Sequence, residues 1–273
     1  MGPDPGGAGA RRLTVLRLSV TPVRSLGLQH PESVQLTEHG VAEDRRYLLT
    51  TPDGRIFDAI KHGPLLRVGA ELADNPERLT LRFPDGHRVT GEVRLGDPET
   101  VEVYGRRFSV RPVVGPWVGA LADYAGRDLR LVRSERQSGE RDRAPVSLVS
   151  QASVHRLEQQ LGAAQALDAR RFRMLIEVTG ATAHEEDAWI GRSVRIGAAV
   201  IRITSHVARC AITTLDPATG QRDLPTLHAI KAYRGMREGR HIDFGVYADV
   251  VTAGPIRRGD SVRVEPWPNG GDS

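Results

Sequence analysis

The sequence predicts a mostly β protein with a few helices, an α+β fold whose two halves meet near residue 112. Many short apolar stretches alternate with polar residues, which is the period of half-buried strands. The chain contains 29 glycines and 17 prolines but only 5% aromatic residues, a composition that favours many turns. Because short strands joined by regular turns are typical of barrels and sandwiches, we expect one of these two architectures in the N-terminal half. With 273 residues, the chain is long enough to bury a sizeable core.

Strand and hairpin signals dominate the first hundred residues. Leu16, Leu18 and Val20 alternate with polar neighbours and predict the first strand. Asp-Gly dipeptides at 53–54 and 85–86 each separate two short runs, which is a hairpin signal. The predicted pairs of strands are 46–51 with 55–60, 79–83 with 88–94, and 101–103 with 108–110.

The second half mixes helices with strands. A helix is predicted over 116–124, because apolar residues recur there at helical spacing and Gly126 can end it. A second helix begins at Ser150 or Ser153, either of which can cap it, and a third covers 224–234. The predicted strands of this half are 174–179, 193–197, 199–205, 244–252 and 261–264.

These elements divide the chain into segments. The first ten residues lack the basic start and apolar run of a secretory signal, so we expect a disordered tail. A charged, aperiodic stretch over 134–143 is expected to be a mobile loop between the halves. The expected organisation is a tail over 1–12, a first domain over 13–112, a connecting helix and strand over 113–135, a second domain over 136–265 and a tail over 266–273.

Composition excludes several classes of protein. No stretch approaches the roughly 20 uncharged apolar residues that a membrane-spanning helix needs, so we expect no membrane contact. The single cysteine, Cys210, excludes an internal disulfide and a four-cysteine zinc site. Because the thiol is alone and no export signal is present, we expect a cytoplasmic location. The net charge is +4, but arginines are interleaved with acidic residues throughout, which favours a solvated surface over a nucleic-acid groove.

Cys210 follows an apolar strand and is the first candidate for chemistry. Free cysteines are usually small buried hydrophobic residues, and the local sequence by itself favours that interpretation. The alternative is a reactive thiolate, which the neighbouring Arg209 would stabilise and which binds soft metals. Both interpretations stay open at this level.

Arginines at the ends of strands form the second group of candidates. Arg24-Ser25 and Asp44-Arg45 each lie where a strand meets a turn, and arginine forks match phosphate oxygens. Surface ion pairing is the favoured interpretation for either motif alone. In the run 170–173, one arginine is expected in a pocket and the others in solvent. The acidic stretch 184–187 lacks a second histidine at metal spacing and predicts a polar loop with a helix start.

Taken in order, several motifs resemble the MOSC family, the molybdenum cofactor sulfurase C-terminal domain proteins, together with the β-barrel domain that precedes MOSC in many members. The resemblance covers roughly residues 13 to 265, and its most specific part surrounds Cys210. The similar segments are Thr21-Pro22-Val23-Arg24-Ser25, 40–47 (GVAEDRRY), 148–153 (LVSQAS), Arg171-Phe172-Arg173, 186–191 (EDAWIG), 209–220 (RCAITTLDPATG) and Phe244-Gly245-Val246-Tyr247.

The resemblance implies a molybdopterin cofactor between an N-terminal β-barrel domain and a MOSC β-barrel domain. Cys210 would ligate molybdenum and be the catalytic residue, because a thiolate is a soft, charged donor. The remaining cofactor-binding residues implied by the resemblance are Arg24, Ser25, Arg45, Ser150, Ser153, Arg173 and Arg209. Two departures stand out: Arg24 occupies a position where relatives usually have lysine, and Met174-Leu175 replaces their common Pro-Asn.

The function that the resemblance implies is the reduction of a small N-hydroxylated or related N–O or S–O substrate. No flavin fingerprint or iron–sulfur cysteine set is present, so a ferredoxin- or flavin-type reductase would supply the electrons. The alternative is a sulfur carrier that bears a persulfide on Cys210, supplied by a separate pyridoxal-phosphate-dependent cysteine desulfurase. A nucleic-acid-binding barrel is the third hypothesis, and it leaves Cys210 without a role.

Overall fold

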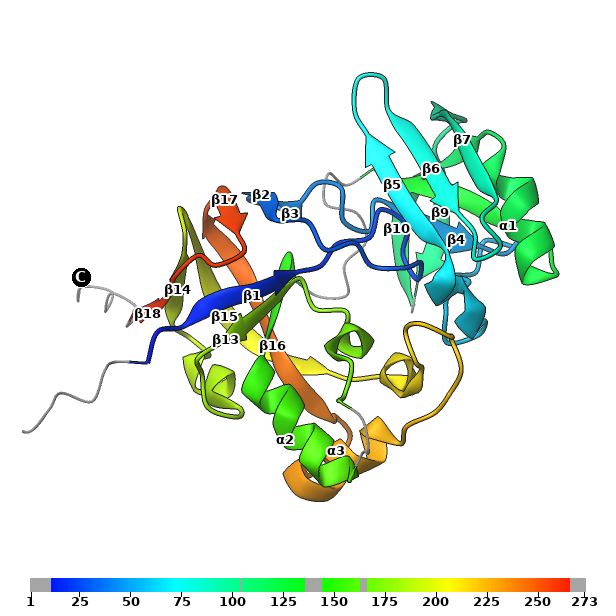
Figure 1. Cartoon of the computed structure of the whole chain (residues 1–273). Coiled ribbons are helices and arrows are strands. Elements are labelled where there is room, and N and C mark those ends of the chain that lie inside the picture. The colour runs from blue at the N-terminus through cyan, green and yellow to red at the C-terminus, as the bar shows by residue number, and fades with distance from the viewer. Residues whose placement is uncertain (1–10, 104, 136–143, 163–165, 266–273) are drawn as a thin grey trace, which may run out of the picture.

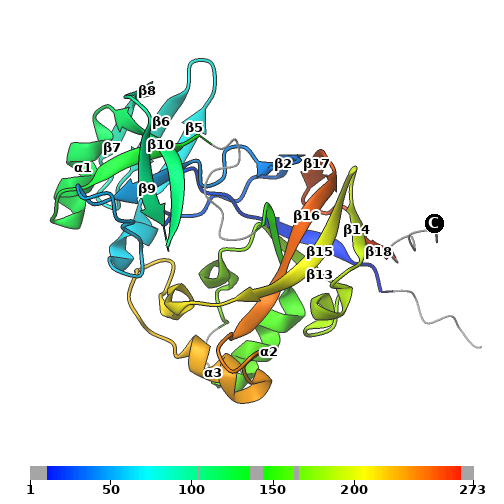
Figure 2. The same ribbon diagram turned by 180° about the vertical axis from the view of Figure 1, so that it is seen from behind.

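The chain folds into two lobes joined by extended segments (Figures 1 and 2). The computed structural model describes residues 11–103, 105–135, 144–162 and 166–265. The described part consists mostly of strands with three α-helices, as the sequence predicts. The predicted tails at 1–10 and 266–273 and the loop residues 136–143 lie outside the described residues.

A seven-stranded sheet forms the second lobe and is nearly closed into a barrel. Its first strand, β1 (Thr14–Leu18), comes from the N-terminus and pairs antiparallel with β13 (Ile176–Thr179). An antiparallel bridge between Thr14 and Ser261 brings β1 beside the start of the last strand of the sheet and nearly completes the ring. The other strands, in sheet order after β13, are β12 (Val146–Ser150), β16 (Asp243–Thr252), β15 (Ala199–Ala208), β14 (Ser193–Ile196) and β18 (Val262–Glu265).

Apolar residues of these strands form the core of the barrel. Leu18, Leu148, Ile176, Ile201 and Val246 are all almost completely buried there. Each apolar side chain of this size stabilises the fold by about 1.5–3 kcal/mol when it leaves water. The barrel is therefore the rigid support from which the loops of the second lobe project.

The first lobe contains two smaller sheets and one helix. Two of its hairpins confirm predicted strand pairs, because β6 (Arg78–Arg82) pairs with β7 (Arg88–Glu92) and β9 (Glu99–Val103) pairs with β10 (Arg106–Val114). Helix α1 (Trp117–Ala125) ends at Gly126 in the left-handed conformation, as predicted. The strands of the lobe are β4 (Tyr47–Thr50), β5 (Gly69–Ala73), β6 (Arg78–Arg82), β7 (Arg88–Glu92), β8 (Arg94–Leu95), β9 (Glu99–Val103), β10 (Arg106–Val114) and β11 (Arg130–Ser134).

One predicted hairpin forms only in part. The run 55–60 is not a strand, but Ile56 forms an antiparallel bridge with Thr50, and backbone hydrogen bonds join Thr51 to Arg55 and Phe57 to Leu49. The other edge of β4 pairs with β11, which lies some eighty residues later in the chain. Local turn signals identify the turn, but they do not reveal which distant strand covers that other edge.

The early strands also belong to the second lobe. Strands β2 (Ser33–Thr37) and β3 (Gly40–Val41) form a three-stranded sheet with β17 (Gly254–Arg257), and β1 lies in the barrel. The range 13–112 therefore includes two strands, β1 and β2, that pair with strands of the second half. The chain crosses between the lobes at 19–32 and again at 42–46, and these crossings carry the arginines discussed below.

Two helices cover the side of the barrel. Helix α2 (Gln151–Leu161) begins after Ser150, whose side chain accepts a hydrogen bond from the backbone N–H of Ser153. It packs against α3 (Thr226–Arg234) and against β12 and β13, whereas α3 also packs against β16. Apolar residues of both helices share one buried cluster with residues of β12, β15 and β16. The prediction that one of two serines caps this helix is confirmed, and Ser150 is the cap.

Candidate functional site

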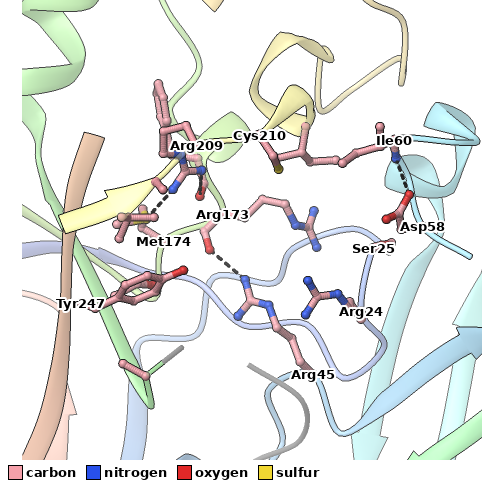
Figure 3. Close-up of a pocket in the computed structure, with 16 residues that line it drawn as sticks. Arg24, Ser25, Arg45, Asp58, Ile60, Arg173, Met174, Arg209, Cys210 and Tyr247 are labelled. Carbon is pink, nitrogen blue, oxygen red and sulfur yellow. Dashed lines mark hydrogen bonds between the residues drawn. The ribbon is translucent and has the colours of Figure 1, made fainter. Parts of the chain in front are cut away.

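A cavity between the lobes brings together residues that are far apart in the sequence (Figure 3). The first lobe and its crossings contribute Arg24, Ser25, Arg45, Asp58 and Ile60, and the second lobe contributes the rest. Six of the eight residues predicted for the site line this cavity, namely Arg24, Ser25, Arg45, Arg173, Arg209 and Cys210. The guanidinium groups of Arg24, Arg45 and Arg173 lie close together beneath Cys210 (Figure 3).

Three of these residues hold a backbone conformation that side chains rarely adopt. Ser25, Arg45 and Arg173 have φ angles of 74°, 55° and 51°. Only six non-glycine residues in the described part of the chain have positive φ, so half of them line one cavity. Each such residue costs of order 1–3 kcal/mol unless the surrounding structure compensates, and such strain concentrates at functional sites.

Arg45 is fixed by contacts on both sides of its side chain. Its backbone N–H donates to the carbonyl of Thr21 at 2.6 Å. Its guanidinium forms an ion pair with Asp44, whose carboxylate is fully buried and also accepts from the Thr21 N–H at 2.8 Å. The other end of the guanidinium donates to the carbonyl of Arg173 at 2.8 Å. The Arg45 fork is therefore held at the boundary between the lobes.

Arg173 makes the reciprocal contact from the second lobe. It ends the 3₁₀ helix η2 (Ala169–Phe172) in the left-handed conformation, and its Nη2 donates to the carbonyl of Leu26 at 2.7 Å. Arg45 and Arg173 thus tie the crossing segment and the second lobe together through two charge-assisted hydrogen bonds to carbonyls. The positive charge at the cavity is built into the junction of the lobes.

Arg209 and Met174 form another part of the wall. The Arg209 guanidinium donates to the carbonyl of Phe172 at 2.7 Å, contacts the Met174 sulfur at 3.4 Å and lies over the Phe172 ring. Met174, at the place of the proline in the expected Pro-Asn, lines the cavity, whereas Leu175, at the place of the asparagine, lies in the barrel core. The departure from Pro-Asn therefore leaves an apolar residue at 175 and places a sulfur at 174 in contact with Arg209.

Cys210 follows strand β15 and precedes the short 3₁₀ helix η4 (Ala211–Thr214). Its side chain is exposed and lines the cavity, so the interpretation as a small buried hydrophobic residue is wrong. Its carbonyl accepts hydrogen bonds from the N–H and hydroxyl of Thr213, at 3.3 and 3.2 Å. These bonds fix the turn that presents the thiol at the end of the strand.

The loop after Cys210 is anchored by a buried arginine. Arg171 is only 4% exposed and forms a bidentate ion pair with Asp223, at 2.7 and 2.5 Å. The sequence predicts that most arginines of 170–173 are solvated, and for Arg171 this is wrong. The same loop meets the first lobe where Gly220 packs on Gly63, so closely that a Cβ on either residue would clash with the other backbone.

Ser150 and Ser153 lie outside the cavity, contrary to the prediction. Both are completely buried, and the two hydroxyl groups are 2.7 Å apart. Glu186 completes the group, because its carboxylate accepts from the Ser153 hydroxyl at 2.7 Å and from the Ser150 N–H at 3.2 Å. Burial raises the pKa of Glu186, while its hydrogen bonds with the serines act in the opposite direction. These serines are structural residues that hold the start of α2.

The neighbouring His184 belongs to this buried group and not to the cavity. Its N–H donates to the Ser153 hydroxyl at 2.7 Å, and its ring contacts Tyr233 and Arg234. Burial and the nearby Arg234 lower the pKa of His184 to about 4. Arg234 also pairs with Asp187 at 2.6 Å, so this stretch belongs to an internal ion-pair network. The predicted helix start is confirmed, because the 3₁₀ helix η3 (Glu185–Trp189) begins directly after His184.

Two further cavity residues were missed as site candidates. Asp58 is buried at the cavity edge and accepts hydrogen bonds from the N–H groups of Ile60 and Lys61. Tyr247 lies on β16, and its hydroxyl faces the arginines across the cavity (Figure 3). Tyr247 ends the Phe-Gly-Val-Tyr motif, so the sequence held a signal for it, whereas Asp58 stands in a run interpreted as a strand.

The cavity therefore combines two kinds of donor. A single exposed thiol can supply a soft anionic ligand to a metal once it is deprotonated. The arginine forks next to it suit an oxyanion such as phosphate.

Within the described residues, no helix is both long and apolar enough to cross a membrane.

Comparison with known proteins identifies both halves of the chain. Residues 12–115 match the MOSC N-terminal beta barrel domain, and residues 135–263 match the MOSC domain. Mitochondrial amidoxime-reducing component 1 from Xenopus laevis is 27% identical over 285 residues, which cover 91% of this chain and 81% of that protein. A molybdenum cofactor sulfurase from Caenorhabditis elegans is 24% identical over 251 residues, which cover 90% of this chain.

The chain spans only about a third of that sulfurase, 34% of its length. Among solved structures, the YUAD protein from Bacillus subtilis aligns over 93% of this chain and 96% of its own, with 10% identity and a TM-score of 0.45. The two domain matches follow one another along the chain and together cover most of it. The protein therefore belongs to the MOSC family, whose relatives are named for the molybdenum cofactor, and it carries the N-terminal β-barrel domain ahead of its MOSC domain.

Proposed function

We propose that this protein is a molybdenum-cofactor-dependent reductase of N-hydroxylated or related N–O and S–O compounds. The observation that carries the proposal is the cavity in which the exposed Cys210 faces the clustered arginines Arg24, Arg45 and Arg173. The similarity to a protein named as an amidoxime-reducing component, which extends over most of both chains, supports this choice of substrate class.

The residues of the cavity fit a cofactor that carries both a metal and a phosphate. Cys210 would hold molybdenum through its thiolate, since sulfur is the preferred donor for soft metals. Arg24, Arg45 and Arg173, with the hydroxyl of Ser25, would hold the phosphate. Arg24 presents a planar fork where lysine presents a point charge, so we expect it to bind two phosphate oxygens at once.

The proposed reduction needs electrons that a partner protein would supply. The molybdenum cofactor supplies the two-electron redox chemistry that breaking an N–O or S–O bond requires. Two electrons from a ferredoxin- or flavin-type reductase and two protons convert the substrate to its reduced form and release the oxygen as water. Tyr247 is suited to orient the small substrate, because its hydroxyl faces the cavity. The absence of nucleic-acid binding and the cytoplasmic location stay predictions.

The test is the metal and pterin content of the purified full chain. We expect near-stoichiometric molybdenum in the wild type and at least a tenfold loss in Cys210→Ala, with the melting temperature unchanged because the side chain is exposed. Ser205→Ala, an exposed position on the same strand β15, is the matched control and should keep its molybdenum. Full molybdenum loading of Cys210→Ala would overturn the proposal.

A sulfur carrier is the second candidate, and the exposure of Cys210 favours it as well. A cysteine desulfurase would transfer sulfur to the thiolate to form a persulfide, which Cys210 would then pass to a cofactor or cluster. Incubation with a desulfurase and cysteine, followed by mass spectrometry, tests it. One added sulfur atom on Cys210 in protein that contains no molybdenum would favour the carrier over the reductase.

A further inference from the structure

A cavity beside helix α2 shares no lining residue with the cavity that contains Cys210. Its walls include β1, one face of α2, Glu177 on β13 and residues 166–169, which lead into η2. Its volume is about 670 Å³, within the range of roughly 300–1,000 Å³ that is usual for small-molecule sites. A ligand of this α2 cavity would therefore contact none of the residues proposed to hold the molybdenum cofactor.

The charged side chains of the α2 cavity leave one carboxylate without a cation. Of the four carboxylates that line it, three pair with arginine, and these pairs are Glu32–Arg258 at 3.3 Å, Asp168–Arg170 at 2.6 Å and Glu177–Arg17 at 2.6 Å. The fourth, Glu158, accepts a hydrogen bond from the Leu167 N–H at 2.7 Å and has no ion pair within the described part of the chain. Apart from its two histidines, the cavity therefore favours a cation over an anion.

Glu177 presents a buried carboxylate to the α2 cavity. The residue is only 7% exposed, and it is one of those that line the cavity. One of its oxygens accepts from Arg17 Nη2 at 2.6 Å, whereas no described residue donates to the other. Burial raises the pKa of Glu177, and the ion pair with Arg17 acts in the opposite direction. Because a buried carboxylate is costly unless its oxygens are hydrogen-bonded, a donor placed in the cavity would stabilise it.

His30 adds an acceptor and not a charge. Its Nδ1 lies 3.2 Å from the carbonyl of Leu18, and because a carbonyl can only accept, this contact assigns the proton to Nδ1. Burial lowers the pKa of His30, so the ring is neutral at pH 7 and its Nε2 accepts. The other histidine of the cavity, His155, is exposed on α2.

Apolar side chains complete the wall of the α2 cavity, and they are Leu16, Pro31, Val154 and Leu167. Within the described residues, no group of three or more His, Cys, Asp or Glu side chains could hold a metal ion. A ligand with an apolar body gains from burial against this wall, whereas a bare ion does not. The cavity therefore suits an organic cation better than a metal.

We infer that the α2 cavity binds an organic monocation, a primary amine with an apolar body. The ammonium group lies against Glu158 and the second oxygen of Glu177, and the body lies against the apolar wall. An ammonium group carries three N–H donors and no acceptor, which matches a cavity whose unengaged groups are mainly acceptors. The inference does not depend on the proposed function, because the two cavities share no residue.

Calorimetry on the full chain at pH 7 tests the inference with two probes of nearly equal size. Benzylamine is a cation at this pH, and benzyl alcohol is its neutral counterpart. We expect benzylamine to bind the wild type at least tenfold more tightly than benzyl alcohol. A tenfold difference corresponds to about 1.4 kcal/mol, close to the contribution of one hydrogen bond to a charged group. Benzylamine that binds no more tightly than benzyl alcohol, or not at all, would overturn the inference.

Glu158→Gln removes the unpaired charge, and its amide oxygen can still accept from the Leu167 N–H. We expect it to weaken benzylamine binding about tenfold and to change benzyl alcohol binding less than twofold. Asp249→Asn removes an exposed carboxylate of β16 outside the cavity and is the matched control, so both affinities should stay unchanged. Equal weakening of benzylamine binding by the two variants would overturn the inference, because Glu158 would then act only through the general field of the protein.

A second variant locates the probe. Ala166 is exposed and lines the α2 cavity, so Ala166→Trp fills part of the space without removing a buried side chain. We expect it to weaken benzylamine binding at least tenfold and to leave the melting temperature unchanged. Unchanged benzylamine affinity in this variant would place the probe elsewhere and overturn the inference.

Discussion

The cavity wall and the start of helix α2 are both rich in polar residues from segments that resemble the MOSC family, yet they differ in physical character. At the cavity wall, Arg24, Arg45 and Arg173 are half-buried and cluster with like charges, and two of them adopt strained backbone conformations. At the start of α2, Ser150 and Ser153 are completely buried and satisfy one another. The comparison teaches that a family motif marks a constrained residue without saying whether a ligand or the fold imposes the constraint.

The sharpest way to break this comparison is to remove the centre of the buried group. Glu186→Ala takes away the acceptor of the Ser153 hydroxyl and the Ser150 N–H and leaves a void. We expect the free energy of unfolding to fall by about 3 kcal/mol, because two buried donors lose a partner and packing is lost. Urea denaturation measures the change. The phosphate affinity of the folded fraction should stay within twofold of the wild-type value. A loss of affinity as large as that caused by substituting a cavity arginine would show that the two regions are coupled.

The opposite result is expected at the cavity wall. Arg24→Ala should weaken phosphate binding about thirtyfold, since a fork at a phosphate contributes roughly 2 kcal/mol. The free energy of unfolding should change by less than about 1 kcal/mol, because Arg24 is half-buried and lies among other positive charges. Calorimetry and denaturation on the same preparation give both numbers. Arg24→Lys, which restores the residue usual among relatives, should recover only part of the affinity.

The buried group also predicts a dependence of stability on pH. His184 has a pKa lowered to about 4 by burial and by Arg234, compared with 6.5 when unfolded. The folded state therefore favours the neutral ring, so stability is complete above pH 6.5 and is lost as the pH falls from 6.5 towards 4. His184→Asn, which tolerates the positive φ at this position, should remove this part of the acid-induced loss.

Denaturation curves at several pH values between 4 and 7 measure the effect. As the pH decreases, the unfolding free energy of the wild type should fall more than that of His184→Asn. A difference that stays constant across this range would show that His184 does not titrate as the network requires. Phosphate affinity at pH 7 should be the same in both proteins, because His184 lies outside the cavity.

The sequence predicted the architecture well where local signals suffice. The alternation of apolar residues, the Gly126 stop and the serine cap located the hairpins and helices, since these depend on neighbours in the chain. The pairing of β4 with β11 could not be predicted, because β11 is distant in sequence and covers the edge of β4 that the adjacent run 55–60 leaves open. The same reason explains why the contribution of β1 to the second-lobe barrel was not foreseen.

For the site, residue types were predictable and orientations were not. Arg173, Arg45 and Cys210 were identified through motifs, and the structure brings them to one cavity. Arg171 differs from Arg173 by two positions, yet it turns inward to Asp223, fifty-two residues later. Side-chain direction in an irregular segment depends on the left-handed turn at Arg173 and on a distant carboxylate, and neither is encoded in the local pattern.

The smallest expected effect tests whether the cavity wall stores strain that the rest of the fold sustains. Ser25 has a φ of 74°, a conformation that glycine adopts without penalty. Ser25→Gly should therefore raise the free energy of unfolding by about 0.5–1 kcal/mol, while the loss of the hydroxyl weakens phosphate binding severalfold. Ser25→Ala keeps the strain and loses the same hydroxyl, so it should weaken binding without the gain in stability. If Ser25→Gly were no more stable than Ser25→Ala, the left-handed conformation would carry no measurable strain. Ser25 would then differ from the fully hydrogen-bonded serines of α2 only in its exposure.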